Sequence, residues 1–150
     1  MTGPEPQEAQ LGVLMFVAYR AMESRAMAAI VEAGFDDVTL AQARVFARIG
    51  PEGTRLTDLA EQAQVTKQTA GFLVDQLEKA GYVERRRDPS DARARLVCIT
   101  EHGARAVQIA NAEVARVEAE WAAHLGDRQM RQLRRTMTRL REITDPYLRS

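Results

Sequence analysis

The segment from residue 56 to residue 103 constrains the fold of this chain more than any other. Two short helical patterns meet in it at a tight break. A strand, an arginine-rich turn, a second strand and a new helix start follow in that order. The order predicts a helix-turn-helix with a β-hairpin wing, and the preceding sequence extends this predicted domain to residues 36–103. In such a domain the second helix of the pair is shaped to enter the major groove of DNA.

Capping and breaking residues set the expected bounds of the elements. Threonines stand before four of the expected helices, and glycines or prolines stand where helices should end. The predicted helices cover residues 10–33, 40–49, 58–63, 67–80, 101–125 and 127–146. N-caps are expected at Thr39, Thr66 and Thr100, and Thr57 precedes the third helix. The predicted strands cover residues 82–87 and 93–99, around a turn at 88–91. The expected fold class is therefore mainly α with a small β-wing.

The helices outside the predicted winged domain have apolar patterns typical of a dimer. The N-terminal helix is apolar over more than the roughly 100° that one core face requires, so it should be buried on two sides. The last two helices repeat apolar residues at alternating steps of three and four, as helices packed side by side do. Residues 10–33 and 105–148 are thus expected to form a helical dimerisation arm, and residues 1–9 a flexible tail. The alternative, an intramolecular hairpin alone, leaves one apolar face of the N-terminal helix exposed.

The charges balance over the chain but not locally. There are 21 Lys and Arg residues and 21 Asp and Glu residues. A DNA-binding surface must neutralise phosphates, so basic residues should cluster even where the total is zero. Five arginines stand against two aspartates between residues 85 and 95, which is the predicted wing. Six more arginines between residues 128 and 141 alternate with apolar residues, and we interpret them as the solvated face of the last helix.

This run of helix, break, helix and wing resembles the MarR family of bacterial winged helix-turn-helix regulators. Three stretches carry the resemblance: VTKQTAGFLVDQLEKAGYVERRRDP, then Asp91-Ala92-Arg93, then LVCITEHG. The resemblance implies a homodimer in which each subunit presents one winged domain to a half-site of a pseudo-palindromic DNA operator. It implies a ligand-responsive repressor with recognition helices about 34 Å apart, one turn of DNA.

Two features depart from the family pattern. Gln64 stands in the helix-turn-helix break, where a glycine is usual. A left-handed Gln costs about 1 kcal/mol more than Gly, so some strain is expected there. Further along, Gly71 and Phe72 occupy positions of the recognition helix that are often polar in the family. The operator sequence therefore cannot be transferred from relatives.

The first turn of the recognition helix holds the candidate base contacts Thr66, Lys67, Gln68 and Thr69. The amide of Gln68 suits adenine N6 and N7, and Lys67 or Thr69 suits phosphate or guanine. The N–H groups at this end of a helix also favour phosphate. The alternative interpretation is an ordinary solvated helix start.

The predicted wing holds the second group of candidates: Arg85, Arg87, Asp91, Arg93 and Arg95. Arg93 follows the turn, where a guanidinium can enter a narrow minor groove. Asp91 is expected to hold that guanidinium by a charge-assisted hydrogen bond. Arg85 and Arg87 alternate along one strand, so they should share a face and flank phosphates. The alternative is a solvated, salt-bridged hairpin.

The family resemblance also implies a small aromatic or phenolic effector in the crevice between the dimerisation arm and the winged domain. Four residues on the arm helices are the candidate ligand contacts: Phe16, Tyr19, Arg20 and Trp121. The alternative for Phe16 and Trp121 is packing in the core of the dimer.

No sequence motif points to an enzyme, since a glycine-rich phosphate loop and a nucleophile motif are both missing. No cofactor and no metal site are expected, because His102 and His124 have no partner at ligand spacing. The single cysteine, Cys98, suits a small core position, and together with an N-terminus unlike a signal peptide it indicates a cytoplasmic protein. The alternative function is a winged-helix module for protein–protein contacts without specific DNA binding, which salt-dependent DNA affinity would exclude.

Overall fold

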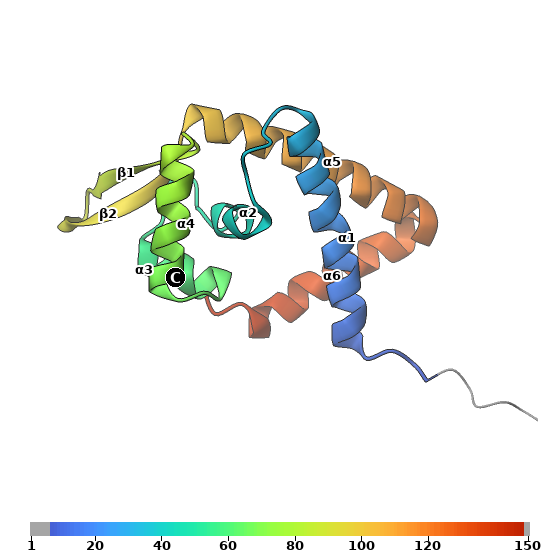
Figure 1. Cartoon of the computed structure of the whole chain (residues 1–150). Coiled ribbons are helices and arrows are strands. Elements are labelled where there is room, and N and C mark those ends of the chain that lie inside the picture. The colour runs from blue at the N-terminus through green and yellow to red at the C-terminus, as the bar shows by residue number, and fades with distance from the viewer. Residues whose placement is uncertain (1–6, 149–150) are drawn as a thin grey trace, which may run out of the picture.

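The computed structural model describes residues 7–148, so most of the predicted tail, residues 1–6, lies outside the described part. Helices account for most of the described chain, and the two strands form one antiparallel hairpin. The elements are α1 (Leu11–Glu32), α2 (Leu40–Phe46), α3 (Leu56–Ala63), α4 (Lys67–Lys79), β1 (Val83–Asp88), β2 (Asp91–Ile99), α5 (Glu101–Leu125) and α6 (Asp127–Thr144). The predicted fold class is confirmed: the chain is mainly α-helical with a β-wing that projects from one end (Figure 1).

The winged domain is held by one apolar core between α2, α3, α4 and the hairpin. Its most deeply buried side chains come from all of these elements: Val45, Leu59, Val74, Leu77, Tyr82, Val83 and Val97. Val97 occupies the core position on β2, and the neighbouring Cys98 is half-buried against Gly53 instead. A backbone bridge between Thr54 and Val97 fastens the segment before α3 to the wing. The base of the wing is therefore rigidly joined to the helix-turn-helix.

The three predicted threonine caps are confirmed. Thr39 forms a full capping box with Gln42, and the hydroxyls of Thr66 and Thr100 each accept a backbone N–H of the first helical turn. Thr57 does not precede the third helix as expected. Helix α3 begins at Leu56, with Arg55 at the N-cap, and the side chain of Arg55 forms an ion pair with Asp88 of the wing.

The break between α3 and α4 has the strained geometry expected from the sequence. Gln64 lies in the left-handed region at φ 57°, ψ 47°, and it is the one non-glycine residue with positive φ among residues 7–148. Its side-chain amide donates to the carbonyl oxygen of Glu61 at 2.6 Å. This bond offsets part of the free-energy cost of the left-handed backbone. Glycine has no side chain that could form it.

The remaining helices form an arm beside the winged domain. Helix α1 packs against α5, and Arg25 joins them by ion pairs to Glu113 and Glu120. Helix α6 has no buried residue, and its C-terminal end returns beside α3, where the hydroxyl of Tyr147 contacts Glu61 (Figure 1). None of the helices within residues 7–148 is both long and apolar enough to cross a bilayer.

The arm leaves a large apolar area uncovered. In the N-terminal half of α1 the exposed large side chains include Leu11, Val13, Leu14, Phe16 and Val17, each at least 45% exposed. The outer side of α6 adds Leu133 and Met137. Exposed apolar surface of this extent marks a contact surface in a protein that is otherwise well packed.

Candidate nucleic-acid interface and adjoining pocket

The first turn of α4 presents four polar residues to solvent: Thr66, Lys67, Gln68 and Thr69. The hydroxyl of Thr66 accepts the backbone N–H of Thr69 at 3.1 Å and lies 2.9 Å from its hydroxyl. Both threonines are thus occupied in capping the helix. Lys67 and Gln68 form no ion pair or side-chain hydrogen bond within the described residues, so their side chains are available to a ligand.

The outer face of α4 continues from Gln68 to a large apolar side chain. Phe72 lies one turn further on, at i+4, and is 62% exposed. The opposite face of the helix is buried in the core through Ala70, Leu73, Val74 and Leu77. The sequence interpretation noted Phe72 only as a departure from the family pattern. The four buried positions would have placed it on the outer face, beside the candidate base contact.

Two of the five wing arginines are neutralised by acidic neighbours. Arg85 forms ion pairs with Asp75 at 2.7 Å and Glu78 at 2.9 Å, both on α4. Arg86 pairs with Glu84 on its own strand. Arg85 therefore joins the wing to the recognition helix and cancels two acidic charges there, which is a different placement from the phosphate-flanking position expected for it.

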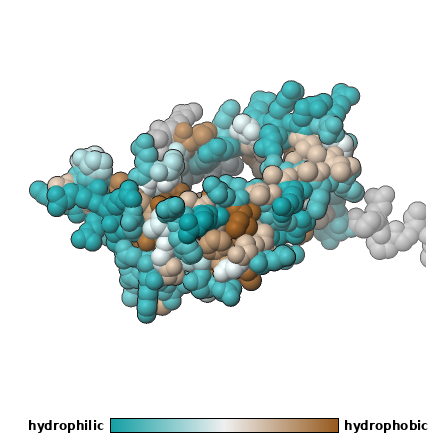
Figure 2. Space-filling model, turned by 90° about the horizontal axis from the view of Figure 1, so that it is seen from above, coloured by the Kyte–Doolittle hydropathy of each residue, from teal (hydrophilic) through white to brown (hydrophobic). Residues whose placement is uncertain are grey.

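The other three wing arginines are exposed and have no acidic partner among residues 7–148. Arg87 lies directly opposite Arg95 across the hairpin, and Arg93 stands nearer the tip. Like charges directly opposite each other in an antiparallel pair are destabilising. Figure 2 shows the projecting wing as mostly hydrophilic. These three arginines thus place uncompensated positive charge on the wing, beside the exposed face of α4.

The expected side-chain bond between Asp91 and the guanidinium of Arg93 is not what the structure shows. The carboxylate of Asp91 instead accepts the backbone N–H of Arg93 at 3.0 Å, which leaves the guanidinium in solvent. A carboxylate two residues before a backbone N–H commonly closes such a turn. Asp91 therefore shapes the turn, and does not aim the arginine.

Asp88, which the sequence interpretation missed, orders the wing turn. Its carboxylate accepts bonds from the N–H and hydroxyl of Ser90 and from the guanidinium of Arg55. These bonds from Ser90 and from Arg55 lower the pKa of Asp88 from 3.8 to about 2. The strands consequently run on to Asp88 and Asp91, which pair with each other, and the predicted four-residue turn shortens to Pro89-Ser90.

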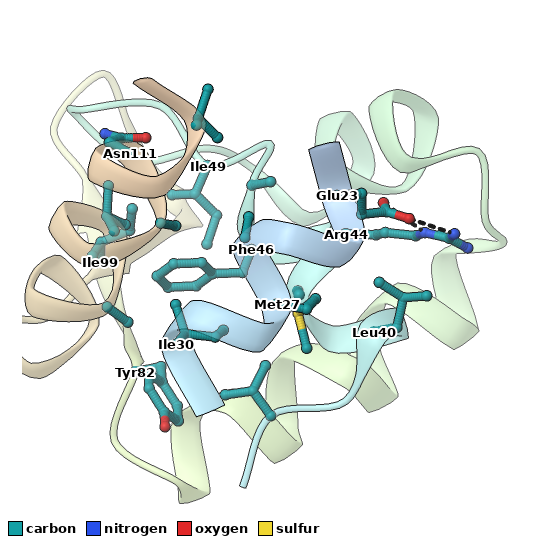
Figure 3. A pocket seen from close by; sticks show the side chains of 18 of the residues that line it. Glu23, Met27, Ile30, Leu40, Arg44, Phe46, Ile49, Tyr82, Ile99 and Asn111 are labelled. Carbon is teal, nitrogen blue, oxygen red and sulfur yellow. Dashed lines mark hydrogen bonds and ion pairs between the residues drawn. The ribbon is translucent and has the colours of Figure 1, made fainter. Parts of the chain in front are cut away.

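A second candidate site lies where the arm meets the winged domain. A cavity of about 320 Å³ opens between α1, α2 and α5, with Leu77, Tyr82 and Ile99 of the winged domain on its wall (Figure 3). Of the four predicted ligand contacts only Tyr19 lines it. Phe16 and Arg20 lie outside, with the guanidinium of Arg20 over the Phe16 ring at 5.4 Å, and Trp121 also lies outside. The crevice is thus where the resemblance placed it, but most of the residues expected there are not.

Most of the wall of this cavity is apolar, and its charged groups are paired. The two charged lining residues, Glu23 and Arg44, bind each other through both carboxylate oxygens at 2.9 and 3.1 Å. The hydroxyl of Tyr82 donates to Asp37, and burial together with this bond raises the pKa of Tyr82. The sequence held no signal for these partners, because 21 residues separate Arg44 from Glu23 and 45 separate Tyr82 from Asp37.

The winged domain also has a recognisable sequence. A profile described as the MarR family matches residues 36–94, from the segment just before α2 into β2. The winged domain is of the MarR family. Curated proteins provide no significant match to the sequence. Within residues 7–148, no group of three or more His, Cys, Asp and Glu side chains is placed to hold a metal ion.

Several solved structures resemble nearly the whole chain. CouR from Rhodococcus jostii, solved with p-coumaroyl-CoA, is 26% identical, with 95% of this chain and 99% of that chain covered and a TM-score of 0.70. A MarR family protein of Mycobacterium tuberculosis, solved with salicylic acid, is 26% identical, with 89% and 98% covered and a TM-score of 0.65. NadR, solved with 4-hydroxyphenylacetate, shares the fold at 22% identity, with 95% and 99% covered and a TM-score of 0.69.

Proposed function

We propose that this chain is a homodimeric, sequence-specific DNA-binding transcriptional regulator of the cytoplasm, and that it acts as a repressor whose operator affinity responds to a small aromatic or phenolic effector. The observation that carries the proposal is the trio of unpaired arginines, Arg87, Arg93 and Arg95, on a wing beside the exposed start of α4. Three acidic side chains of the wing and α4, namely Asp75, Glu78 and Glu84, are already matched with Arg85 or Arg86. A surface that keeps uncompensated positive charge is suited to phosphates.

In the proposed complex the two DNA-binding elements have different roles. Helix α4 enters the major groove, where the amide of Gln68 reads an adenine and the ring of Phe72 packs on the methyl group of a thymine. The wing follows the backbone, with Arg87 and Arg95 on phosphates and Arg93 in the minor groove. Arg85 keeps Asp75 and Glu78 of α4 from repelling the phosphates.

The proposed dimer buries the apolar surface of the arm. Exposed apolar side chains on α1 and the lack of any buried residue on α6 support this interface. A symmetric dimer would cover both surfaces at once and present two winged domains to one operator. Sedimentation at micromolar concentration should therefore give a dimer, and a folded monomer would contradict the interface.

The proposed switch uses the cavity between the arm and the winged domain. A ligand there would contact α1 and α5 of the arm as well as α2 and Leu77 of α4. A ligand that binds more tightly at one spacing of the two winged domains would shift the population toward that spacing. At a spacing that does not match the operator, one winged domain loses its contacts with its half-site.

Selection from random duplexes with the purified chain tests the proposal. The expected result is a pseudo-palindromic site bound with an affinity that falls steeply with salt, as release of several counterions requires. The alternative, a winged-helix module for protein–protein contacts, predicts no enriched sequence and no salt-dependent affinity for any duplex.

A further inference from the structure

We infer that the cavity between α1, α2 and α5 selects uncharged aromatic ligands and discriminates against carboxylates. This inference rests on the proposed role of the cavity as the effector site, and it concerns the chemical class of the effector. The relatives named above were solved with salicylic acid, 4-hydroxyphenylacetate or a coenzyme A thioester, two of which carry a carboxyl group. In the cavity of this chain, the charge of the one lining cation, Arg44, is already balanced by Glu23.

The ion pair in the wall of the cavity neutralises the charge of Arg44, the one cation among the lining residues. Both carboxylate oxygens of Glu23 accept from the Nε and Nη2 atoms of Arg44, a geometry that fully engages that edge of the guanidinium. The Glu23 side chain is only 13% exposed. Hydrogen bonding from Arg44 also lowers the pKa of Glu23, so this carboxyl is ionised at neutral pH. The net charge that the pair presents to a ligand is zero.

Other basic residues near the cavity do not replace Arg44. Arg48 is exposed beyond the lining and acts on Glu23 only through its charge. Arg20 lies over the ring of Phe16 outside the cavity, and Arg25 is bound to two glutamates of α5. Every basic group on the helices around the cavity is thus remote from it or already paired.

A carboxylate would therefore meet an unfavourable environment. It would lose its water shell against an apolar wall, where an unpaired charge is strongly disfavoured. The Nη1 edge of Arg44 stays open on a side chain that is 54% exposed, but Glu23 already balances its charge. A ligand carboxylate bound there would therefore place a second negative charge on one guanidinium. An uncharged ring has neither cost, and it gains the apolar contact that the wall provides.

One polar group of the wall is available to orient such a ligand. Asn111 of α5 is exposed and makes no side-chain hydrogen bond within the described residues. Figure 3 shows Asn111 and the Glu23–Arg44 pair on opposite sides of the cavity, with the ring of Phe46 between them. The class that fits is an uncharged aromatic compound with one hydroxyl or carbonyl group for the amide of Asn111.

Calorimetric titration of the full chain at pH 7 with a matched pair of probes tests this inference. The probes are 4-hydroxyphenylacetamide, which is neutral, and 4-hydroxyphenylacetate, which has the same ring and hydroxyl but carries a charge. The expected result is tighter binding of the amide by about tenfold or more. Equal or tighter binding of the carboxylate, or no binding of either probe, would overturn the inference.

The Glu23→Gln variant locates the selectivity in the ion pair. It keeps the shape of the side chain but leaves the charge of Arg44 uncompensated, so affinity for the carboxylate should rise by about tenfold or more and affinity for the amide should change little. Glu32→Gln, which changes an exposed acid on the same helix outside the cavity, should leave both affinities unchanged. If Glu23→Gln fails to fold by circular dichroism, the ratio of the two affinities in the unmutated chain still decides.

Failure of this inference can be told apart from failure of the proposed function. A chain that selects and binds a DNA site but prefers the carboxylate refutes only the ligand class. A chain that prefers the amide but binds no DNA site refutes the DNA-binding function and leaves the selectivity of the cavity standing.

Discussion

The double substitution Arg87→Ala and Arg95→Ala should flatten the salt dependence of DNA binding by an amount that follows from the structure. The two arginines face each other across the hairpin without an acidic partner in the described residues. Each subunit of a dimer would then lose two phosphate contacts. At a slope of about −0.9 per neutralised phosphate, loss of about four contacts lowers the magnitude of the log–log slope by about 3.6. When salt rises from 50 to 200 mM, the factor by which the double variant loses affinity should therefore be about 150 times smaller than the factor for the unmutated chain.

Fluorescence anisotropy with a labelled duplex from the selection experiment, at five potassium chloride concentrations, measures this slope. Arg86→Ala is the matched control, because Arg86 lies on the same strand but is already paired with Glu84. Its slope should stay close to that of the unmutated chain. The reasoning is refuted if the double variant keeps the full slope, or if Arg86→Ala flattens the slope as much.

Three further predictions test the recognition helix, the packing behind it and the wing turn. Replacing thymine by uracil in the selected site should weaken binding by about 0.8 kcal/mol for each methyl group that Phe72 contacts. Phe72→Ala should abolish this difference in affinity. A uracil effect that persists in the variant would exclude contact between Phe72 and the methyl group. Gly103→Ala should destabilise the fold by about 1–3 kcal/mol in urea unfolding, because the new Cβ would lie 2.3 Å from the carbonyl oxygen of Tyr82; Gly71→Ala, which meets only one side chain at 3.6 Å, should not. The lowered pKa of Asp88 stabilises the folded chain above pH 3.8, and this contribution is lost as the pH falls towards about 2; Asp88→Asn should remove that pH dependence from acid unfolding curves, and an unchanged curve would contradict it.

Local signals in the sequence were enough to predict most of the winged domain. The capping threonines at 39, 66 and 100 form bonds within one helical turn. Both partners of each bond are therefore close in the sequence, where a local pattern can reveal them. The strain at Gln64 is equally local, since a tight break between two helices requires one left-handed residue. The start of α3 is different, because Arg55 is held by Asp88, 33 residues later.

The positions of the candidate residues could be predicted where one element presents them, but not where two elements share them. Thr66 to Thr69 and the three unpaired arginines lie on the exposed start of one helix and on one hairpin, as expected. Arg85 looked equivalent to Arg87 by alternation, but only the packing of the wing on α4 brings Asp75 and Glu78 within reach of it. The cavity shows the same limit more strongly. Its wall is formed by α1 and α5 of the arm together with residues of the winged domain. Sequence periodicity cannot show which side of α1 faces the cavity.

The most direct test of the DNA-binding function is the ratio of affinities for the selected duplex and for a scrambled duplex of equal length and composition, at 150 mM salt. The account predicts a preference of about 10³ or more for the selected site. It also predicts that Gln68→Ala lowers affinity for that site by about 1–3 kcal/mol while leaving affinity for the scrambled duplex nearly unchanged. Equal affinities of the unmutated chain for the two duplexes would contradict sequence-specific recognition by α4.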